Sequence, residues 1–381
     1  MEAYRQTLES IMGIPFTDGN RLTVLKNGVE IFPAMLKAID EADRSIDMVT
    51  YVYWKGDIAH NFAESLARKA RKGVNVRLIL DAFGAKPMPK KLLRIMQEGG
   101  VHIRWFRPLS RWKLWNINNR THRKVLICDG KIGFTGGVGI AEEWEGDARN
   151  PNEWRETHFQ VEGPAVFGLH AAFLENWIET DGHMNMATDR LDSIPAKGNT
   201  SLQMLHTDAS VRWSDSFILF SALLLMAKRT IRITTAYFDP DAPMIDLFRR
   251  VRARGVDVQV LVPGPYMDIW VAKIAAETNY EVLLNMGVDI WHYQQAMLHA
   301  KVILIDDGVA CVGSANFNQR SLKKDDEIIQ VILDPPTVQI LQAHFQEDLR
   351  FAKQLSTENW NKRSALQRMK EILVRPFREN L

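Results

Sequence analysis

The apolar and polar positions of this chain describe one succession of elements twice. In each copy a short apolar run, typical of a strand, precedes a basic helical stretch and two further runs that begin with Gly-Val. The four segments lie at residues 45–50, 62–72, 73–80 and 100–106 in the first copy, and at 230–235, 247–254, 255–262 and 287–293 in the second. Strands that alternate with helices predict an α/β/α sandwich for each copy.

The tandem repeat predicts two similar halves within one chain, related by a pseudo-twofold axis. We expect the first half at residues 19–190 and the second at 191–350, between an N-terminal segment at 1–18 and a C-terminal tail at 351–381. A stretch at residues 189–200 contains proline, glycine and asparagine, which are typical of a loop, and marks the junction.

The composition is that of a soluble globular protein with two or three domains. Of 381 residues, 46% are hydrophobic and 25% are charged, and 48 basic side chains nearly balance 46 acidic ones. A net charge of +2 disfavours a dedicated nucleic-acid binder, which usually carries a larger basic excess. Cys128 and Cys311 stand in apolar runs, which is typical of small buried side chains and gives no disulfide or zinc pattern.

No segment has the pattern of a secretory signal or a membrane span. The N-terminus lacks a basic start followed by an apolar run. The longest apolar run, at residues 217–227, is about half as long as a bilayer requires and predicts a core helix. Any membrane association is therefore expected to be peripheral.

The string His-x-Lys-x4-Asp follows the repeated strands in both halves. Its members are His122, Lys124, Asp129, His299, Lys301 and Asp306. The apolar residues after each lysine predict that the motif lies on a strand, and residues two apart on a strand share a face, so each histidine should point the same way as its lysine. A buried lysine without a partner is costly, so two at the same spacing favour a functional site over coincidence.

Two imidazoles, each accompanied by a lysine, can cut and remake a phosphodiester without a metal. One can attack phosphorus while the other protonates the leaving oxygen, because an ordinary pKa near 6.5 makes both forms available at neutral pH. Lys124 and Lys301 can neutralise the phosphate charge. A turn behind each motif can add hydrogen bonds to the phosphate, and its candidate residues are Gly137, Gly139, Ser314 and Asn316.

Acidic residues near the motifs have two predicted tasks. A catalytic imidazole needs an acceptor at its second nitrogen, and Glu156 and Glu327, each at the start of the next apolar strand, are candidates. The alternative is a solvated acid at a strand end, and the sequence leaves open which glutamate serves which histidine. Asp129 and Asp306 belong to the motif and thus to the candidate catalytic set, but each stands within two residues of a turn glycine. We therefore expect them to order neighbouring chain rather than to carry protons.

An insert in the first half is a candidate membrane-facing surface. About ten extra residues precede the first motif, in the basic stretch 107–121, which contains Trp112, Lys113 and Trp115. Tryptophan and cationic side chains favour the headgroup zone of a bilayer. The alternative is a basic loop whose tryptophans are buried in the core.

The C-terminal tail is a second candidate. Beyond residue 351, apolar residues recur at helical spacing, among them Trp360, and basic residues such as Arg368 surround them. Such a segment can lie in an anionic lipid interface, or it can dock as a helix on the protein body.

The doubled motif, with Gly-Ser-x-Asn behind its second copy, resembles the phospholipase D superfamily. Within it the chain is similar to bacterial cardiolipin synthases of the class that lacks N-terminal membrane spans, over roughly residues 20–350. Two positions depart from the family pattern. Members often have Asn where this chain has Gly139, and Asp where it has Asn318.

The resemblance implies a metal-independent reaction through a phosphohistidine at the interface of the halves. It implies that His122 is the nucleophile and His299 the general acid, and that Glu156 and Glu327 support the two imidazoles. The implied activity is a phosphatidyltransferase that makes cardiolipin from phosphatidylglycerol, as a peripheral protein at the cytoplasmic side of the cell membrane.

The expected partners are anionic phospholipids and a membrane surface, and neither a cofactor, a metal nor a nucleic acid is expected. Three alternatives stay open. A hydrolytic phospholipase D would use the same residues with water as acceptor and release phosphatidic acid. A nuclease of the same superfamily would show a continuous basic groove, and a non-catalytic membrane adaptor would have a retired site.

Overall fold

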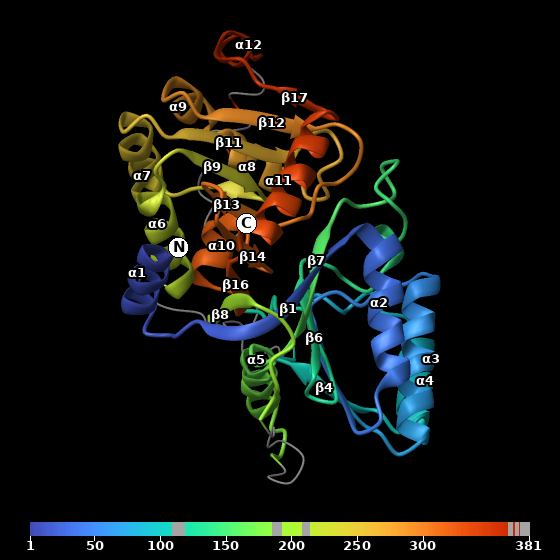
Figure 1. Cartoon of the computed structure of the whole chain (residues 1–381). Coiled ribbons are helices and arrows are strands. Elements are labelled where there is room, and N and C mark those ends of the chain that lie inside the picture. Colours follow the sequence, from blue (N-terminus) through green and yellow to red (C-terminus); the bar gives the residue numbers. More distant parts are fainter. Residues whose placement is uncertain (109–118, 185–192, 208–213, 365–368, 370–372, 374–381) are drawn as a thin grey trace.

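In the computed structural model, one mixed sheet runs through the whole molecule (Figure 1). The structure describes every residue except 109–118, 185–192, 208–213, 365–368, 370–372 and 374–381. The predicted boundary between the halves, at residues 190 and 191, lies outside the described residues. Among those described, fifteen strands form the sheet.

Seven strands come from the N-terminal part of the chain, called the first half below: β1 (Thr17–Lys26), β2 (Ser45–Thr50), β3 (Asn75–Asp81), β4 (His102–Phe106), β5 (Val125–Cys128), β6 (Ile132–Gly136) and β7 (Thr157–Glu162). The others form the second half: β8 (Thr200–Thr207), β9 (Thr230–Thr234), β11 (Asp257–Pro263), β12 (Asp289–Tyr293), β13 (Val302–Ile305), β14 (Val309–Gly313), β16 (Glu327–Leu333) and β17 (Ala352–Gln354). A separate two-stranded sheet pairs β10 (Phe238–Asp239) with β15 (Phe317–Asn318).

The strand order is the same on both sides of the sheet centre. It reads β1-β7-β6-β5-β2-β3-β4 outward in the first half and β8-β16-β14-β13-β9-β11-β12 in the second, where β17 adds an outer strand. At the centre β1 and β8 pair antiparallel, with Asn20 opposite Thr200. This arrangement relates the halves by a pseudo-twofold axis, so the predicted α/β fold of two tandem halves is confirmed.

Each half places the residues before its motif strand at one edge of the sheet. In the first half β2 and β3 are parallel, and β5 runs antiparallel to β2 with Val125 opposite Val49. In the second half β13 runs antiparallel to β9 with Val302 opposite Thr234. The segments that enter β5 and β13 therefore lie at the carboxyl ends of the parallel strands, where open α/β sheets bind ligands.

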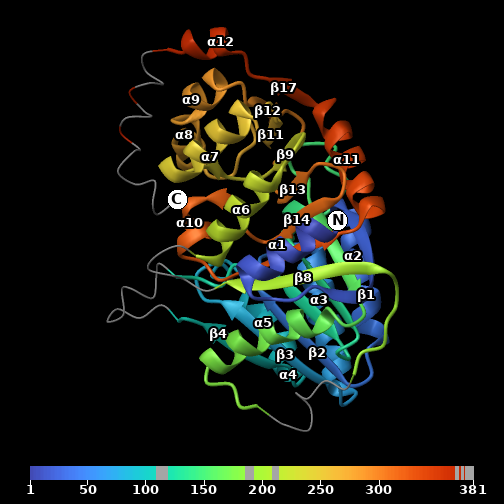
Figure 2. The ribbon, with the colours of Figure 1, turned by 60° about the vertical axis from the view of Figure 1, so that its left-hand side comes forward.

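Helices cover both faces of each half. In the first half these are α2 (Asn27–Glu41), α3 (Asp57–Arg71), α4 (Lys90–Glu98) and α5 (Val166–Glu179), and a short 3-10 helix, η2 (Glu142–Trp144), follows β6. In the second half they are α6 (Asp215–Met226), α7 (Ala242–Ala253), α8 (Trp270–Glu277), α9 (Tyr280–Asn285), α10 (Gln319–Lys323) and α11 (Pro335–Leu349). The chain begins with α1 (Glu2–Met12), which packs on α6, and α12 (Thr357–Asn361) follows β17 (Figures 1 and 2).

Three large apolar clusters form the core. One lies under α2, α3 and α4 of the first half, and one under α6, α7 and α9 of the second. The third joins the halves, because Val125 of β5 and Val302 of β13 belong to it together with side chains of α5 and α11. The predicted core helix at residues 217–227 is α6, whose Phe220 and Leu223 are buried. None of the helices that the structure describes has the length and apolar character to cross a bilayer.

The prediction that Trp360 faces a membrane is wrong. The side chain is only 7% exposed and belongs to the core of the second half. Its ring packs on Tyr280 of α9, with ring centres 5.3 Å apart, so the apolar surface of α9 covers it. The alternative of a docked segment holds for this residue. The other candidate membrane-facing residues, Trp112, Lys113, Trp115 and Arg368, lie outside the described residues.

Candidate active site

The two motif histidines enter the site on backbone that is paired with the opposite half. The N–H of His122 donates to the Asp326 carbonyl at 2.9 Å, and the N–H of His299 donates to the Arg155 carbonyl at 2.8 Å. Strands β5 and β13 begin only after the lysines, at Val125 and Val302. The prediction that each histidine and lysine lies on the motif strand is therefore wrong, because the backbone N–H of each histidine bonds to the opposite half.

Each imidazole is held by a carboxylate from the opposite half. Nδ1 of His122 lies 3.0 Å from both oxygens of Glu327, at the start of β16. Nδ1 of His299 lies 2.6 Å from Oε2 of Glu156, just before β7. The structure thus pairs the glutamates crosswise, a point that the sequence left open. Both carboxylates are fully buried, so neither is a solvated acid at a strand end.

Burial and neighbouring cations keep both imidazoles neutral. Burial lowers the pKa of His122 to about 4, with Glu327 opposing the shift and Lys124 and Lys301 adding to it. Burial and then the charge of Lys301 lower the pKa of His299 well below its ordinary value. Because each histidine feels the lysine of the other half, the four side chains share one site.

The two lysines are buried beside their histidines. The ammonium of Lys124 donates to the His122 carbonyl at 2.7 Å, and that of Lys301 donates to the His299 carbonyl and lies 3.1 Å from Nε2 of His299. Burial lowers the pKa of Lys124 to about 7 and that of Lys301 to about 8. A bound anion would favour their charged forms and raise both pKa values.

The charges suit a phosphodiester. When a bound phosphodiester keeps both lysines charged, they balance the two glutamates while both imidazoles are neutral, and the phosphodiester leaves one negative charge in excess. Uptake of one proton by an imidazole restores the balance and creates the acid that a leaving alkoxide needs. Within the described part of the chain, no group of three His, Cys, Asp or Glu residues is arranged to hold a metal ion.

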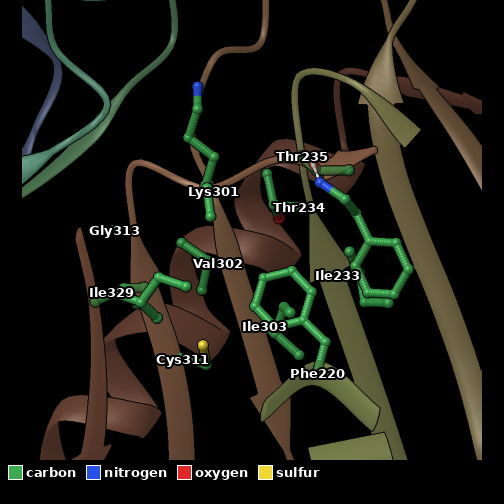
Figure 3. A pocket seen from close by; sticks show the side chains of 13 residues that line it. Phe220, Ile233, Thr234, Thr235, Lys301, Val302, Ile303, Cys311, Gly313 and Ile329 are labelled. Carbon is green, nitrogen blue, oxygen red and sulfur yellow. Dashed lines mark hydrogen bonds between the residues drawn. The ribbon is translucent and has the colours of Figure 1, made fainter. Parts of the chain in front are cut away.

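The aliphatic part of the Lys301 side chain packs against apolar residues. A cavity of about 10 Å³ lies beneath it, lined by residues that include Phe220, Ile303 and Cys311. This space admits one water at most. Figure 3 shows the ammonium directed away from the cavity.

Both cysteines, Cys128 and Cys311, are buried and unpaired in the structure, as the sequence predicts.

The motif aspartates lie at the far ends of β5 and β13 from the imidazoles. The Asp129 carboxylate accepts backbone N–H bonds from residues 43–45, and Asp306 accepts them from residues 228–230 and a hydroxyl bond from Tyr4. Both residues have positive φ, 55° and 51°. Their inclusion in the catalytic set is corrected on this geometry, which fits the ordering task expected for them.

Of the two side chains predicted to bind phosphate behind the second motif, Ser314 is engaged by Glu327 and Asn316 is not. Ser314 donates its hydroxyl to Oε2 of Glu327 at 2.5 Å and accepts the N–H of Ile328, so it positions Glu327. Oδ1 of the buried Asn316 has no hydrogen-bond partner among the described residues, which leaves this side chain available to a ligand.

The two glycines make room for other groups. A Cβ on Gly137 would lie 2.4 Å from Oε2 of Glu156, and a Cβ on Gly139 would lie 2.9 Å from the Trp144 ring. The glycines thus let Glu156 and Trp144 approach.

Sequence reasoning missed three aromatic residues. Tyr51 lies edge-on to His122, with ring centres 5.3 Å apart, and beneath the Lys124 ammonium. Trp144 and Trp154 flank His299 at 5.3 Å and 5.4 Å. Tyr51 directly follows the first repeated strand and Trp154 stands two residues before Glu156, so their positions at the ligand-binding edge were the available signal.

Comparisons with known proteins agree with this geometry. A model of the family described as "Cardiolipin synthase, PLD-like domain" matches residues 35–145 and 220–349. Cardiolipin synthase 1 of Bacillus cereus is 32% identical over 379 residues, which cover 97% of this chain and 74% of that protein. Probable cardiolipin synthase YwiE of Bacillus subtilis is 31% identical over 363 residues, or 94% of this chain and 72% of that protein.

A solved structure shares the fold over its full length. Phosphatidylserine synthase of Haemophilus influenzae aligns with a TM-score of 0.76 and 13% identity, and the alignment covers 100% of both chains. At this identity the likeness concerns the fold alone.

Proposed function

Because the chain belongs to the family of cardiolipin synthases with phospholipase D-like domains, we propose that it transfers a phosphatidyl group from one phosphatidylglycerol to a second and so makes cardiolipin. The observation that carries this proposal is the crosswise pair of His122–Glu327 and His299–Glu156. It orients two imidazoles, and the charge of each lysine acts on both of them, which supports a single binding position for a phosphate.

In the first step Nε2 of His122 attacks phosphorus of the donor lipid. The phosphorus–oxygen bond to the headgroup glycerol breaks, and protonated His299 gives its proton to the departing oxygen. The product is phosphatidyl-His122 and free glycerol. Lys124 and Lys301 stabilise the charge on the non-bridging oxygens throughout.

In the second step a hydroxyl of another phosphatidylglycerol attacks the phosphohistidine. His299 takes the hydroxyl proton, the phosphorus–nitrogen bond breaks, and His122 is regenerated with cardiolipin as product. Transfer rather than hydrolysis requires that the lipid hydroxyl, and not water, occupies the acceptor position.

Three features support the assignment of His122 as nucleophile. Its side chain is 13% exposed, against 8% for His299. The pKa of Glu327 is lowered to about 2, since His122, Lys124 and Ser314 together overcome the effect of burial, so its charge can stabilise a cationic phosphohistidine. Burial raises the pKa of Glu156, which suits a partner for a histidine that gains and loses a proton.

The test is product analysis with purified protein and phosphatidylglycerol vesicles. Mass spectrometry should find cardiolipin and free glycerol in equal amounts, with no change in EDTA, and His122→Ala should give neither. Phosphatidic acid without cardiolipin would instead identify a hydrolase. Since the substrates reside in a bilayer, we also propose that the protein acts peripherally at the cytoplasmic side of the cell membrane.

A further inference from the structure

Two loops leave the sheet at the edge that holds the imidazoles. The loop 82–89 joins β3 to α4, and the loop 264–269 joins β11 to α8. Each loop contacts residues that lie beside the imidazoles or the lysines. Gly84 lies against the Tyr51 backbone, since a Cβ there would be 2.3 Å from the Tyr51 carbonyl oxygen. Asp268 accepts the Tyr237 hydroxyl at 2.8 Å and feels the charge of Lys301.

Both loops expose large apolar side chains beside the charged Lys86 and Asp268. Phe83 is 50% exposed in the first loop, and Ile269 and Trp270 are 46% and 65% exposed at the end of the second. Tyr266, 41% exposed, lies in the same loop. Single exposed apolar residues are ordinary, but several large ones on two loops that border one site are typical of an interaction surface.

Cations follow Phe83 without acidic partners. Lys86, Lys90, Lys91 and Arg94 are exposed, and none of them forms an ion pair with a residue that the structure describes. Lys90 and Lys91 open α4, whose first turn contains no acidic residue and whose N-cap is Pro89. Cations at a helix N-terminus oppose the helix dipole. An anionic partner outside the protein would offset this repulsion.

We propose that Phe83, Lys86, Lys90, Lys91, Ile269 and Trp270 form a mouth surface that docks on an anionic bilayer. The aromatic and aliphatic side chains enter the boundary between headgroups and acyl chains, and the lysines contact lipid phosphates. A donor lipid then reaches His122 without leaving the membrane. This inference rests on the proposed function and deepens it, because it states how the site meets its substrate.

The positive charge of the mouth surface favours an anionic bilayer over a second copy of this chain as its binding partner. A second copy of the chain would bring the same cations face to face, whereas a phosphatidylglycerol bilayer complements them. Figures 1 and 2 show α4 in the first half and α8 in the second, so each half supplies one of the two loops.

Co-sedimentation with vesicles tests the proposal directly. The vesicles are phosphatidylglycerol mixed equally with phosphatidylcholine, or phosphatidylcholine alone. One variant removes the apolar anchors (Phe83→Ser with Trp270→Ser), and the other reverses charge (Lys90→Glu with Lys91→Glu). Matched controls are Phe167→Ser with Phe351→Ser, which are exposed aromatics elsewhere, and Lys72→Glu with Lys131→Glu, which lie at the opposite edge of the sheet.

Each mouth-surface variant should bind the anionic vesicles about tenfold or more weakly than the wild type. Charge reversal should also abolish the preference for anionic over neutral vesicles. Both controls should bind as the wild type does. Turnover of a monomeric short-chain phosphatidylglycerol should persist in every variant, which shows that each one folds.

Equal binding by wild type and mouth-surface variants would overturn the proposal, as would wild-type protein that ignores anionic vesicles. A dimer that dissociates on Phe83→Ser with Trp270→Ser would assign the surface to a second copy instead. Sedimentation needs no turnover, so protein that docks through this surface but makes no cardiolipin would reject only the proposed function.

Discussion

The two halves of the site repeat one motif but enclose their histidines differently. His122 meets one aromatic ring and both oxygens of Glu327, which Ser314 also holds. His299 lies between Trp144 and Trp154 and meets one oxygen of Glu156. The pKa of Glu327 is lowered while that of Glu156 is raised. Identical motifs thus acquire different chemistry from their surroundings, as pairs of titratable groups do in other enzymes.

The turns behind the motifs show how the difference arises. In the second half Ser314 and Asn316 keep polar side chains at the site. In the first half the matching positions are Gly137 and Gly139, whose missing side chains admit Glu156 and Trp144. Two small residues therefore convert a polar turn into space for an acid and a tryptophan that serve the other half.

The largest expected effect separates the two histidines. His122→Ala should lower cardiolipin synthesis to background, and His299→Ala should lower it by about 10²- to 10⁴-fold, the usual contribution of a general acid. A phosphodiester with a nitrophenyl leaving group needs no acid, so His299→Ala should still release nitrophenol in a burst while His122→Ala should not. A burst from His122→Ala alone would reverse the roles of the halves.

Exchange of each glutamate for its amide should sharpen the contrast. Glu327→Gln removes a permanent charge beside the proposed phosphohistidine and should lower kcat by about 10³-fold. Glu156→Gln should lower kcat by about 10²-fold. Steady-state kinetics with thermal unfolding as a fold control would measure both. Equal losses would mean that the environments of the two acids do not set their roles.

We expect kcat/KM to fall at alkaline pH, as an alkaline limb of its pH profile, because the two lysines lose their charge. Since the pKa of Lys124 is about 7 and that of Lys301 about 8, both lysines lose their charge as pH rises through these values. Loss of the first charge should lower kcat/KM by about fivefold between pH 7 and pH 8. Lys124→Arg stays charged and should move the limb toward the pKa of Lys301, whereas Lys301→Arg should leave its onset in place. A limb unchanged by Lys124→Arg would assign it to another group.

The smallest effect concerns the motif aspartates, where the halves are alike. Asp129→Asn and Asp306→Asn each weaken several bonds to backbone N–H groups and should lower the free energy of unfolding by about 1–3 kcal/mol. Urea denaturation would measure this change. Activity below the unfolding temperature should stay near that of the wild type, and a loss comparable to that of the glutamate variants would restore these residues to the catalytic set.

The repeat, the fold class and the two histidine–lysine pairs follow from the sequence because they depend on short spacings. Strand and helix periodicities, and the recurrence of His122 and Lys124 as His299 and Lys301, are local patterns. Which glutamate meets which histidine depends on contacts between residues about 143 and 205 positions apart, and no local pattern encodes those.

The two wrong predictions, on the start of the motif strands and on Trp360, also come from contacts between residues that are distant in the sequence. The backbone of His122 and His299 pairs with the opposite half instead of extending β5 and β13, so the strands begin later than periodicity predicts. Trp360 has the sequence signature of an interfacial tryptophan, yet the apolar surface around Tyr280 buries it. In both cases a distant partner overrides a correct local preference.

The crosswise support of the histidines has a consequence for the protein during its synthesis. The first half leaves the ribosome with His122 and Lys124 in place, but Glu327 and Ser314 are still untranslated. If the proposed roles hold, a nascent chain carries the nucleophile without its supporting carboxylate and without the partner acid, so it should not attack lipids before the C-terminal strands fold against it. Two fragments cut between the halves should likewise be inert separately and active only after they reassociate.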